Sequence, residues 1–198
     1  MKTNIKGIIE DLNKLYDKYI NEVEVSLSKY INDVNYYNLA INPNHSNRSE
    51  DDVNIIRISR YKDLEKLISG IGFYIILTDY RYSDNKCKLS ICPEGINVKA
   101  VYRGHSYTLR ERVESHIFNT KYNEKRAEKK RNNKYTTNFD ICMKLEEGKQ
   151  GVDIDETKYK SNVFYIIQHK MNNSNETQRK IMEKVFDKKY DKPIACMD

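Results

Sequence analysis

Two tyrosines, an arginine and a histidine near the middle of the chain form a pattern that can act on a phosphate ester. Tyr74 follows a glycine and a phenylalanine, and Tyr102 stands before an arginine and a glycine. Arg112 and His116 come next, four positions apart. A guanidinium can bridge two phosphate oxygens, and a phenol or an imidazole can transfer a proton. These residue types and their spacing indicate a phosphodiester-cutting site within residues 72–116.

A helix must carry Arg112 and His116 if the two side chains are to act together. Thr108 and Glu111 have the spacing of a capping box, which predicts a helix over residues 109–119. Side chains four positions apart lie on one side of a helix, so the arginine and the histidine are expected next to each other. The buried edge of this helix is predicted to contain Leu109, Val113 and Ile117.

Aromatic and β-branched runs place the two tyrosines on neighbouring strands. Residues 73–78 are almost continuously apolar and predict a central strand with both faces covered. Residues 96–102 predict a second strand, and residues 89–92 a short one before it. An antiparallel hairpin or meander is therefore expected over residues 72–102. One face of the second strand is predicted to carry Ile96, Val98, Ala100 and Tyr102, with Val101 on the other face.

The later part of the chain supplies further strands and a closing helix. Residues 163–171 form the second strongest strand pattern, and residues 138–145 a weaker one. From Glu176 the apolar residues recur at helical spacing, and Pro193 ends the region. We therefore predict an α+β fold, a small antiparallel sheet of three or more strands flanked by helices. The closing helix is expected to bury Ile181, Met182, Val185 and Phe186.

Residues 1–67 are expected to form a long N-terminal helical extension of a domain at residues 68–198. Apolar residues recur at helical spacing along residues 4–39, in one long helix or in two with a break near residue 24. This stripe must pack on the same domain or on a second copy, so a homodimer is an open alternative. The stripe contains Ile5, Ile8, Ile9, Leu12, Leu15, Tyr16, Tyr19, Ile20 and Val23.

A basic segment at about residues 121–137 holds much of the excess positive charge. It lacks apolar periodicity, so we expect an exposed and mobile insertion. Such a segment is either a solvated face or a loop that contacts DNA phosphates without sequence preference. The candidate contacts are Lys125, Arg126, Lys129, Lys130 and Arg131.

The composition limits the class of protein. The 198 residues are enough for one domain with a core, and the net charge of +6 weakly favours a polyanionic partner. The four cysteines lack the spacing of a zinc site. No apolar run approaches the roughly 20 residues that a membrane span requires. We therefore expect a cytoplasmic protein that does not enter a membrane.

The motifs together resemble the GIY-YIG nuclease superfamily. Gly72-Phe73-Tyr74 is similar to the first motif of that family, and Tyr102-Arg103-Gly104 to the second. Arg112 and His116 follow where the family places its helix. The resemblance covers about residues 68–195. It implies a core of three antiparallel strands flanked by helices and an endonuclease that cuts DNA with Mg²⁺ or Mn²⁺.

The resemblance also implies a role for each matched residue. Tyr74 and Tyr102 match the motif tyrosines, one of which activates the attacking water. Arg112 matches the arginine that binds the scissile phosphate. His116 matches a position that often holds a histidine near that phosphate.

One glutamate on the closing helix is implied as the metal ligand. Glu183 is the first choice and Glu176 the second. A phenol acts as a general base only if neighbouring cations lower its pKa. Arg103, His105 and Arg112 are the groups expected to do so.

The chain departs from the family pattern at three points. Arg103 replaces an apolar residue, so it either faces solvent or adds a phosphate contact, with His105 beside it. The gap between the two motifs is longer than in the family. Residues 193–195 stand where the family has an asparagine. Two alternatives remain open, a non-catalytic nucleic-acid-binding module on the same fold and a protein-interaction module built on the N-terminal helices.

Overall fold

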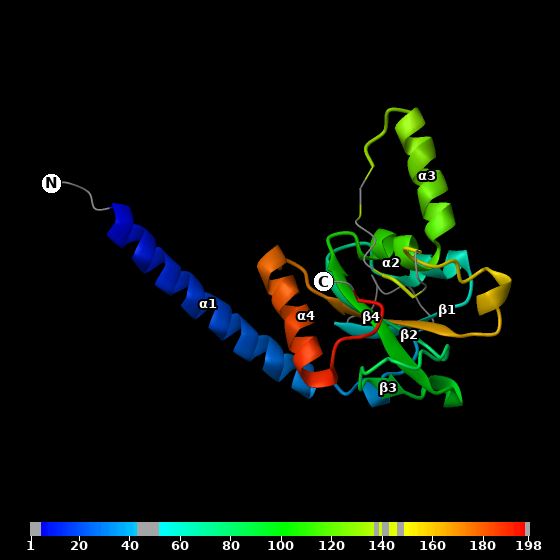
Figure 1. The fold of residues 1–198 in the computed structure, drawn as a ribbon, viewed down its shortest axis with the longest axis horizontal. Helices are drawn as coiled ribbons and strands as arrows, with labels where there is room; N and C mark the ends of the chain where they lie inside the picture. Colours follow the sequence, from blue (N-terminus) through cyan, green and yellow to red (C-terminus); the bar gives the residue numbers. More distant parts are fainter. Residues whose placement is uncertain (1–4, 43–51, 137–138, 140–142, 146–148, 197–198) are drawn as a thin grey trace.

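A sheet of five antiparallel strands forms the centre of the protein (Figure 1). The computed structural model describes residues 5–42, 52–136, 139, 143–145 and 149–196. The strand order is β1-β5-β2-β4-β3. The predicted α+β class is confirmed. The strands are β1 (Val53–Ile58), β2 (Gly72–Thr78), β3 (Ser90–Ile91), β4 (Val98–Ser106) and β5 (Phe164–Lys170).

Helices cover the two faces of this sheet. Short 3-10 turns lie at residues 36–38, 61–66, 93–95 and 157–159. The α-helices are α1 (Ile5–Asp33), α2 (Leu109–Ile117), α3 (Asn119–Arg131) and α4 (Glu176–Tyr190).

β2 lies in the middle of the sheet because its aromatic and branched side chains fill both faces. All seven of its residues are buried. Tyr74 and Ile76 pack in one apolar cluster with Val113 of α2. Phe73 and Ile75 pack in a second cluster with residues of α4. The sheet therefore separates an α2 side from an α4 side.

A β-bulge in β4 decides the side on which Tyr102 lies. Ile76 is opposite Tyr102, but the next residue, Leu77, is opposite Ala100, so Val101 is an extra residue in the ladder. An extra residue reverses the alternation of side chains beyond it. Tyr102 packs on the α2 side, whereas Ala100 packs on the α4 side. The prediction that these two residues share a face is therefore wrong.

The N-terminal region combines a long helix with a strand of the sheet. α1 is continuous over Ile5–Asp33, which settles the choice between one helix and two. Glu24 of α1 accepts hydrogen bonds from Lys184 and Lys188 of α4, at 2.9 and 2.5 Å. β1 pairs with β5, so residues 53–58 belong to the sheet although the predicted helical extension includes them. The domain boundary at residue 67 stays a prediction. Among the described residues, no helix has both the length and the apolar character needed to cross a membrane.

The basic segment is a helix and not an irregular insertion. α2 begins at Leu109 as predicted, but the Thr108 side chain makes no capping hydrogen bond. Phe118 leaves helical geometry, and α3 then continues to Arg131. Helix propensity explains the difference, because Glu, Lys, Arg and Ala all favour a helix even without an apolar stripe. The strand predicted at residues 138–145 lies mostly outside the described residues.

Candidate active site

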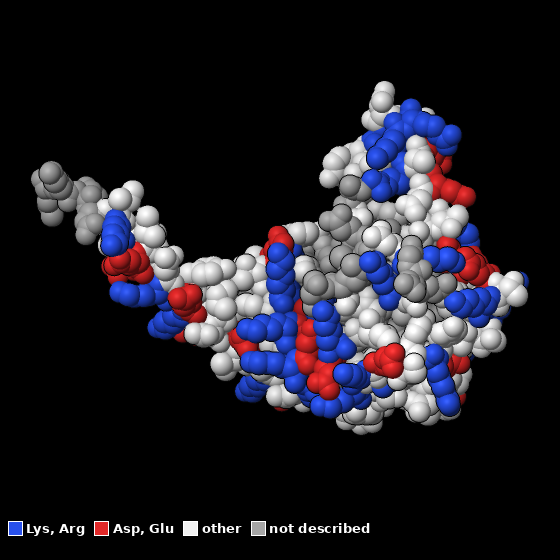
Figure 2. All heavy atoms as spheres, in the orientation of Figure 1, with Lys and Arg blue, Asp and Glu red and all other residues white. Residues whose placement is uncertain are grey.

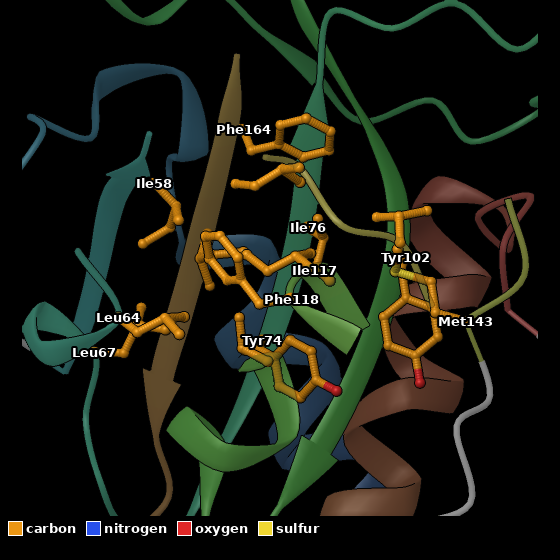
Figure 3. Packing of buried hydrophobic residues seen from close by; sticks show 14 of the residues in the cluster. Ile58, Leu64, Leu67, Tyr74, Ile76, Tyr102, Ile117, Phe118, Met143 and Phe164 are labelled. Carbon is orange, nitrogen blue, oxygen red and sulfur yellow. The ribbon is translucent and has the colours of Figure 1, made fainter. Parts of the chain in front are cut away.

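Three of the predicted catalytic side chains form one aromatic cluster. Tyr74 comes from β2, Tyr102 from β4 and His116 from α2. The ring centroids lie 6.0 Å apart for the two tyrosines, 4.5 Å for Tyr102 and His116, and 6.1 Å for Tyr74 and His116. Figure 3 shows both phenol hydroxyls directed to the same side of the apolar cluster. The structure thus brings together residues that three different elements contribute.

Gly104 gives the Tyr74 ring the space that it occupies. Gly104 is opposite Tyr74 in the β2–β4 ladder. A Cβ atom at this glycine would lie 2.8 Å from the Tyr74 hydroxyl oxygen and 3.0 Å from Cε1 of Tyr102. Any other residue would push the two rings apart. The glycine of the second motif therefore has a packing role inside the cluster.

The Tyr74 phenol is held in its neutral form. It is fully buried, and its hydroxyl has no hydrogen-bond partner within the described part of the chain. Burial, followed by the neighbouring Tyr102, raises its pKa well above the usual value. Arg112 lowers this pKa and Glu183 raises it, so both charges lie within electrostatic range of the phenol. For Tyr74 the expectation that cations lower the pKa is wrong, because desolvation outweighs Arg112.

His116 is a neutral imidazole. It is fully buried, and neither ring nitrogen has a hydrogen-bond partner among the described residues. Burial, and then the charge of Arg112, holds the pKa of His116 well below 6.5. The imidazole is therefore a weak base and stays unprotonated at neutral pH.

Arg112 lies one turn before His116 on α2, as predicted. Its side chain is partly exposed. The guanidinium carbon lies 5.2 Å from the centre of the Phe139 ring. Its effects on the pKa values of Tyr74 and His116 place a positive charge beside the cluster. It is therefore the described cation best placed to bind a phosphate there.

Arg103 and His105 lie on the opposite side of the sheet, in an ion-pair network. Arg103 donates to Asp187 from Nε and Nη2, at 3.1 and 2.6 Å, and to Glu183 from Nη1 at 3.0 Å. His105 Nδ1 lies 2.8 Å from the other Glu183 oxygen. Arg103 is only 6% exposed, and its carboxylate partners raise its pKa. This arginine holds α4 against β4. The two predicted roles, a solvent-facing side chain or a phosphate contact, do not describe this position.

Asp187 is the member of this network that sequence reasoning missed. It lies one helical turn after Glu183 on α4. That spacing puts two carboxylates on one side of the helix, facing the charged positions of the neighbouring strand. The spacing of the two carboxylates is visible in the sequence, but the sequence does not show which strand the helix covers.

Glu183, the predicted metal ligand, has both carboxylate oxygens engaged, one with Arg103 and one with His105. The described residues contain no group of three or more His, Cys, Asp or Glu side chains placed for a metal. Mg²⁺ nevertheless needs only one or two carboxylates when water and phosphate supply its other ligands. The network has two carboxylates but one guanidinium, so further positive charge is favourable once His105 releases Glu183. Glu176, the second choice, is exposed and pairs with Lys180 at 2.7 Å.

The predicted DNA-contacting residues of α3 divide into two groups. Figure 2 shows lysines and arginines gathered over α3, which projects from the body. Lys125 pairs with Glu114 at 3.2 Å and also contacts Tyr61, and Arg126 is partly buried. The exposed cations at the end of the helix have no ion pair within the described part of the chain. These are Lys129, Lys130 and Arg131.

Comparisons of this chain with models of protein families, with curated proteins and with solved structures find no match. The resemblance to the GIY-YIG superfamily therefore stays a prediction from the motifs.

Proposed function

We propose that this protein is a metal-dependent endonuclease that hydrolyses phosphodiester bonds in DNA, with a site of the GIY-YIG type. The main support is the cluster of Tyr74, Tyr102 and His116, with Arg112 one turn before His116 on α2. Glu183 lies in the ion-pair network on the α4 side. The chain order also agrees with the resemblance. Two motif strands are followed by the arginine helix, a third strand and the helix that carries the glutamate.

Arg112 binds the scissile phosphate in this proposal. Hydrolysis builds negative charge on the phosphate, and a fixed guanidinium stabilises that charge in the transition state. The phosphate replaces the Phe139 ring as the group over Arg112. Low exposure of the surrounding rings strengthens the interaction, because less water screens it.

Tyr102 keeps its predicted place next to the attacking water in the proposal. Burial raises the pKa of Tyr74, so this phenol keeps its own proton and does not act as a base. Tyr102 orients the water, whose proton passes to solvent as the oxygen attacks the phosphorus. His116 lies against the Tyr102 ring and positions it, because burial and Arg112 hold its pKa too low for it to take the proton.

Glu183 holds the divalent cation, with Mg²⁺ or Mn²⁺ as the candidates. When bound, such a cation supplies Lewis-acid stabilisation of the leaving oxygen. Arg103 would orient the carboxylate through its hydrogen bond, and His105 would leave the other carboxylate oxygen to the cation. The exposed cations of α3 bind the DNA backbone outside the site, in a way that weakens with salt.

A non-catalytic nucleic-acid-binding module is the second candidate. Its specific support is the closed site, in which Tyr74 and His116 are fully buried and both Glu183 oxygens already accept hydrogen bonds. A module of this kind keeps the basic α3 and binds DNA without cutting it.

Incubation of the purified protein with supercoiled plasmid separates the two candidates. The endonuclease converts the plasmid to nicked or linear DNA with Mg²⁺ or Mn²⁺ and leaves it intact with EDTA. A filter-binding or fluorescence assay in the same buffers measures DNA affinity. Salt-sensitive binding without metal-dependent cutting contradicts the endonuclease and supports the binding module.

A further inference from the structure

The outer half of α1 carries an apolar stripe that no described part of the chain covers. Figure 1 shows this half of the helix running away from the body. Its apolar side chains are 50–71% exposed. Contiguous apolar surface of this kind marks an interaction site. The exposed residues are Ile5, Ile8, Ile9, Leu12, Leu15 and Tyr16.

The same side of α1 is partly buried where the helix reaches the body. Val23, Leu27 and Tyr30 pack against the cluster that contains α4. Two lysines of α4 fix this inner half through Glu24. One helix therefore has a covered apolar half and an uncovered half, and the stripe runs through both.

The spacing of the stripe matches a helix–helix seam. Ile5, Ile8, Leu12, Leu15 and Tyr19 follow one another at alternating intervals of three and four. This is the a and d pattern of a coiled coil, in which two helices bury their seams against each other.

The charges beside the seam indicate that the partner is a second copy in the antiparallel direction. Asp11 and Lys18 occupy the same flank, one heptad apart. In the antiparallel alignment, Leu12 of one copy is level with Leu15 of the other. Asp11 then lies beside Lys18 of the second copy. The two-fold symmetry of the pair forms the same contact a second time, from Lys18 to Asp11. In a parallel pair, Asp11 instead lies beside Tyr16 and gains no opposite charge. The helix is thus complementary to itself only when reversed.

A hollow in the body lies where the end of the second helix arrives. Its volume is about 540 Å³, and it is lined by Val23, Leu27 and Tyr30 of α1 together with Met171 and Met182. In the antiparallel alignment, the first turn of the second helix is level with Glu22, at the rim of this hollow. The seam therefore leads into a hollow whose apolar lining on α1 continues it and whose other walls carry polar residues such as Asp52, Lys170 and Gln178.

We propose that two copies of this chain associate through the outer halves of α1, paired antiparallel, with the first turn of each helix seated in the hollow of the other copy. The proposal does not depend on the nuclease activity. The predicted alternative of a homodimer thereby acquires a direction, a register and a second contact.

Sedimentation equilibrium or light scattering over a concentration series tests the association. Wild type is expected to be a dimer. The double variant Leu12→Glu/Leu15→Glu is expected to be a monomer whose melting temperature is unchanged. Lys6→Glu is the matched control, because it changes the net charge of α1 by the same amount at an exposed position away from the seam. It is expected to remain a dimer. Wild type that stays monomeric up to about 100 μM overturns the proposal. The proposal is also overturned if the double variant remains a dimer, or if the control variant becomes a monomer as well.

A charge exchange tests the direction of pairing. Asp11→Lys alone is expected to raise the dissociation constant of the dimer roughly tenfold, since both symmetric pairs become repulsive. Lys18→Asp alone is expected to do the same. The double variant restores both pairs and returns the constant to near the wild-type value. Single variants without effect, or a double variant that dissociates further than either, contradict the antiparallel register.

Discussion

The two sides of β4 carry opposite kinds of chemistry. On the α2 side, Tyr102 joins Tyr74 and His116 in a buried cluster of neutral, protonatable rings. On the α4 side, Arg103 and His105 are tied to carboxylates of α4. The rings of the proposed site thus lie apart from the ion pairs that hold α4 against β4, and Glu183, the proposed metal ligand, belongs to those ion pairs. Gly104 lies against both tyrosine rings and leaves the room that the Tyr74 ring occupies.

The charged side is expected to be the more sensitive to substitution. Arg103→Leu leaves Asp187 and Glu183 facing each other with little solvent, and it should cost about 3 kcal/mol of unfolding free energy. Urea unfolding measures this. Arg57→Leu is the matched control, since its ion pair with Glu94 is half exposed and should be worth less than about 1 kcal/mol. Equal losses in the two variants contradict the structural role of the network.

Two buried histidines allow a second comparison. His169 is bonded by Tyr30 and Tyr36, at 2.9 and 3.0 Å, whereas His116 has no partner among the described residues. His169→Leu leaves two hydroxyls unpaired and is expected to cost about 2 kcal/mol. His116→Leu should leave stability unchanged or slightly higher, while plasmid cutting is lost. A large destabilisation by His116→Leu argues for a structural histidine.

Gly104→Ala is expected to disturb the contact between the two tyrosines. The added methyl group overlaps the Tyr74 hydroxyl and should cost about 1–3 kcal/mol of unfolding free energy. Gly70→Ala is the control, because a Cβ there meets nothing within 4 Å. If the two variants unfold at the same urea concentration, the close packing around Tyr74 is not real.

Stability is expected to fall as the pH drops below about 6.5. Burial lowers the pKa of His116 well below its usual value and that of His169 to about 3. The unfolded chain therefore binds protons that the folded chain does not. Above the pKa of a histidine in the unfolded chain, the folded state keeps its full stability. Below that pKa, each buried histidine lowers the free energy of unfolding by about 1 kcal/mol per pH unit. Urea midpoints at pH 7 and pH 5.5 measure the slope, which His116→Leu should roughly halve. An unchanged slope contradicts the buried neutral state.

The sequence predicted those features that local patterns control. The apolar run at residues 73–78 gave the central strand, and Leu109 was correctly expected to begin the helix that carries Arg112. The structure also brings the rings of Tyr74, Tyr102 and His116 together, while their catalytic roles stay a prediction. Each of these predictions depended on spacing within one element or on a known pair of motifs.

The remaining features depend on contacts between distant parts of the chain. The bulge at Val101 reverses the face of Tyr102, and alternation within a single strand does not predict it. The partners of Arg103 lie on α4, far along the sequence, so its burial in ion pairs was not foreseen. The pKa of Tyr74 depends on burial, which exceeded the effect of the nearby cation.

The rate of plasmid cutting by Arg112→Ala tests the central claim most directly. Arg81→Ala serves as the control, because it removes an exposed arginine outside the cluster. With Mg²⁺ present, wild type and the control are expected to nick supercoiled DNA at similar rates. Arg112→Ala should be slower by roughly a hundredfold to a thousandfold, with an unchanged urea midpoint. If the folded Arg112→Ala variant cuts as fast as wild type, this cluster is not the site of phosphodiester hydrolysis.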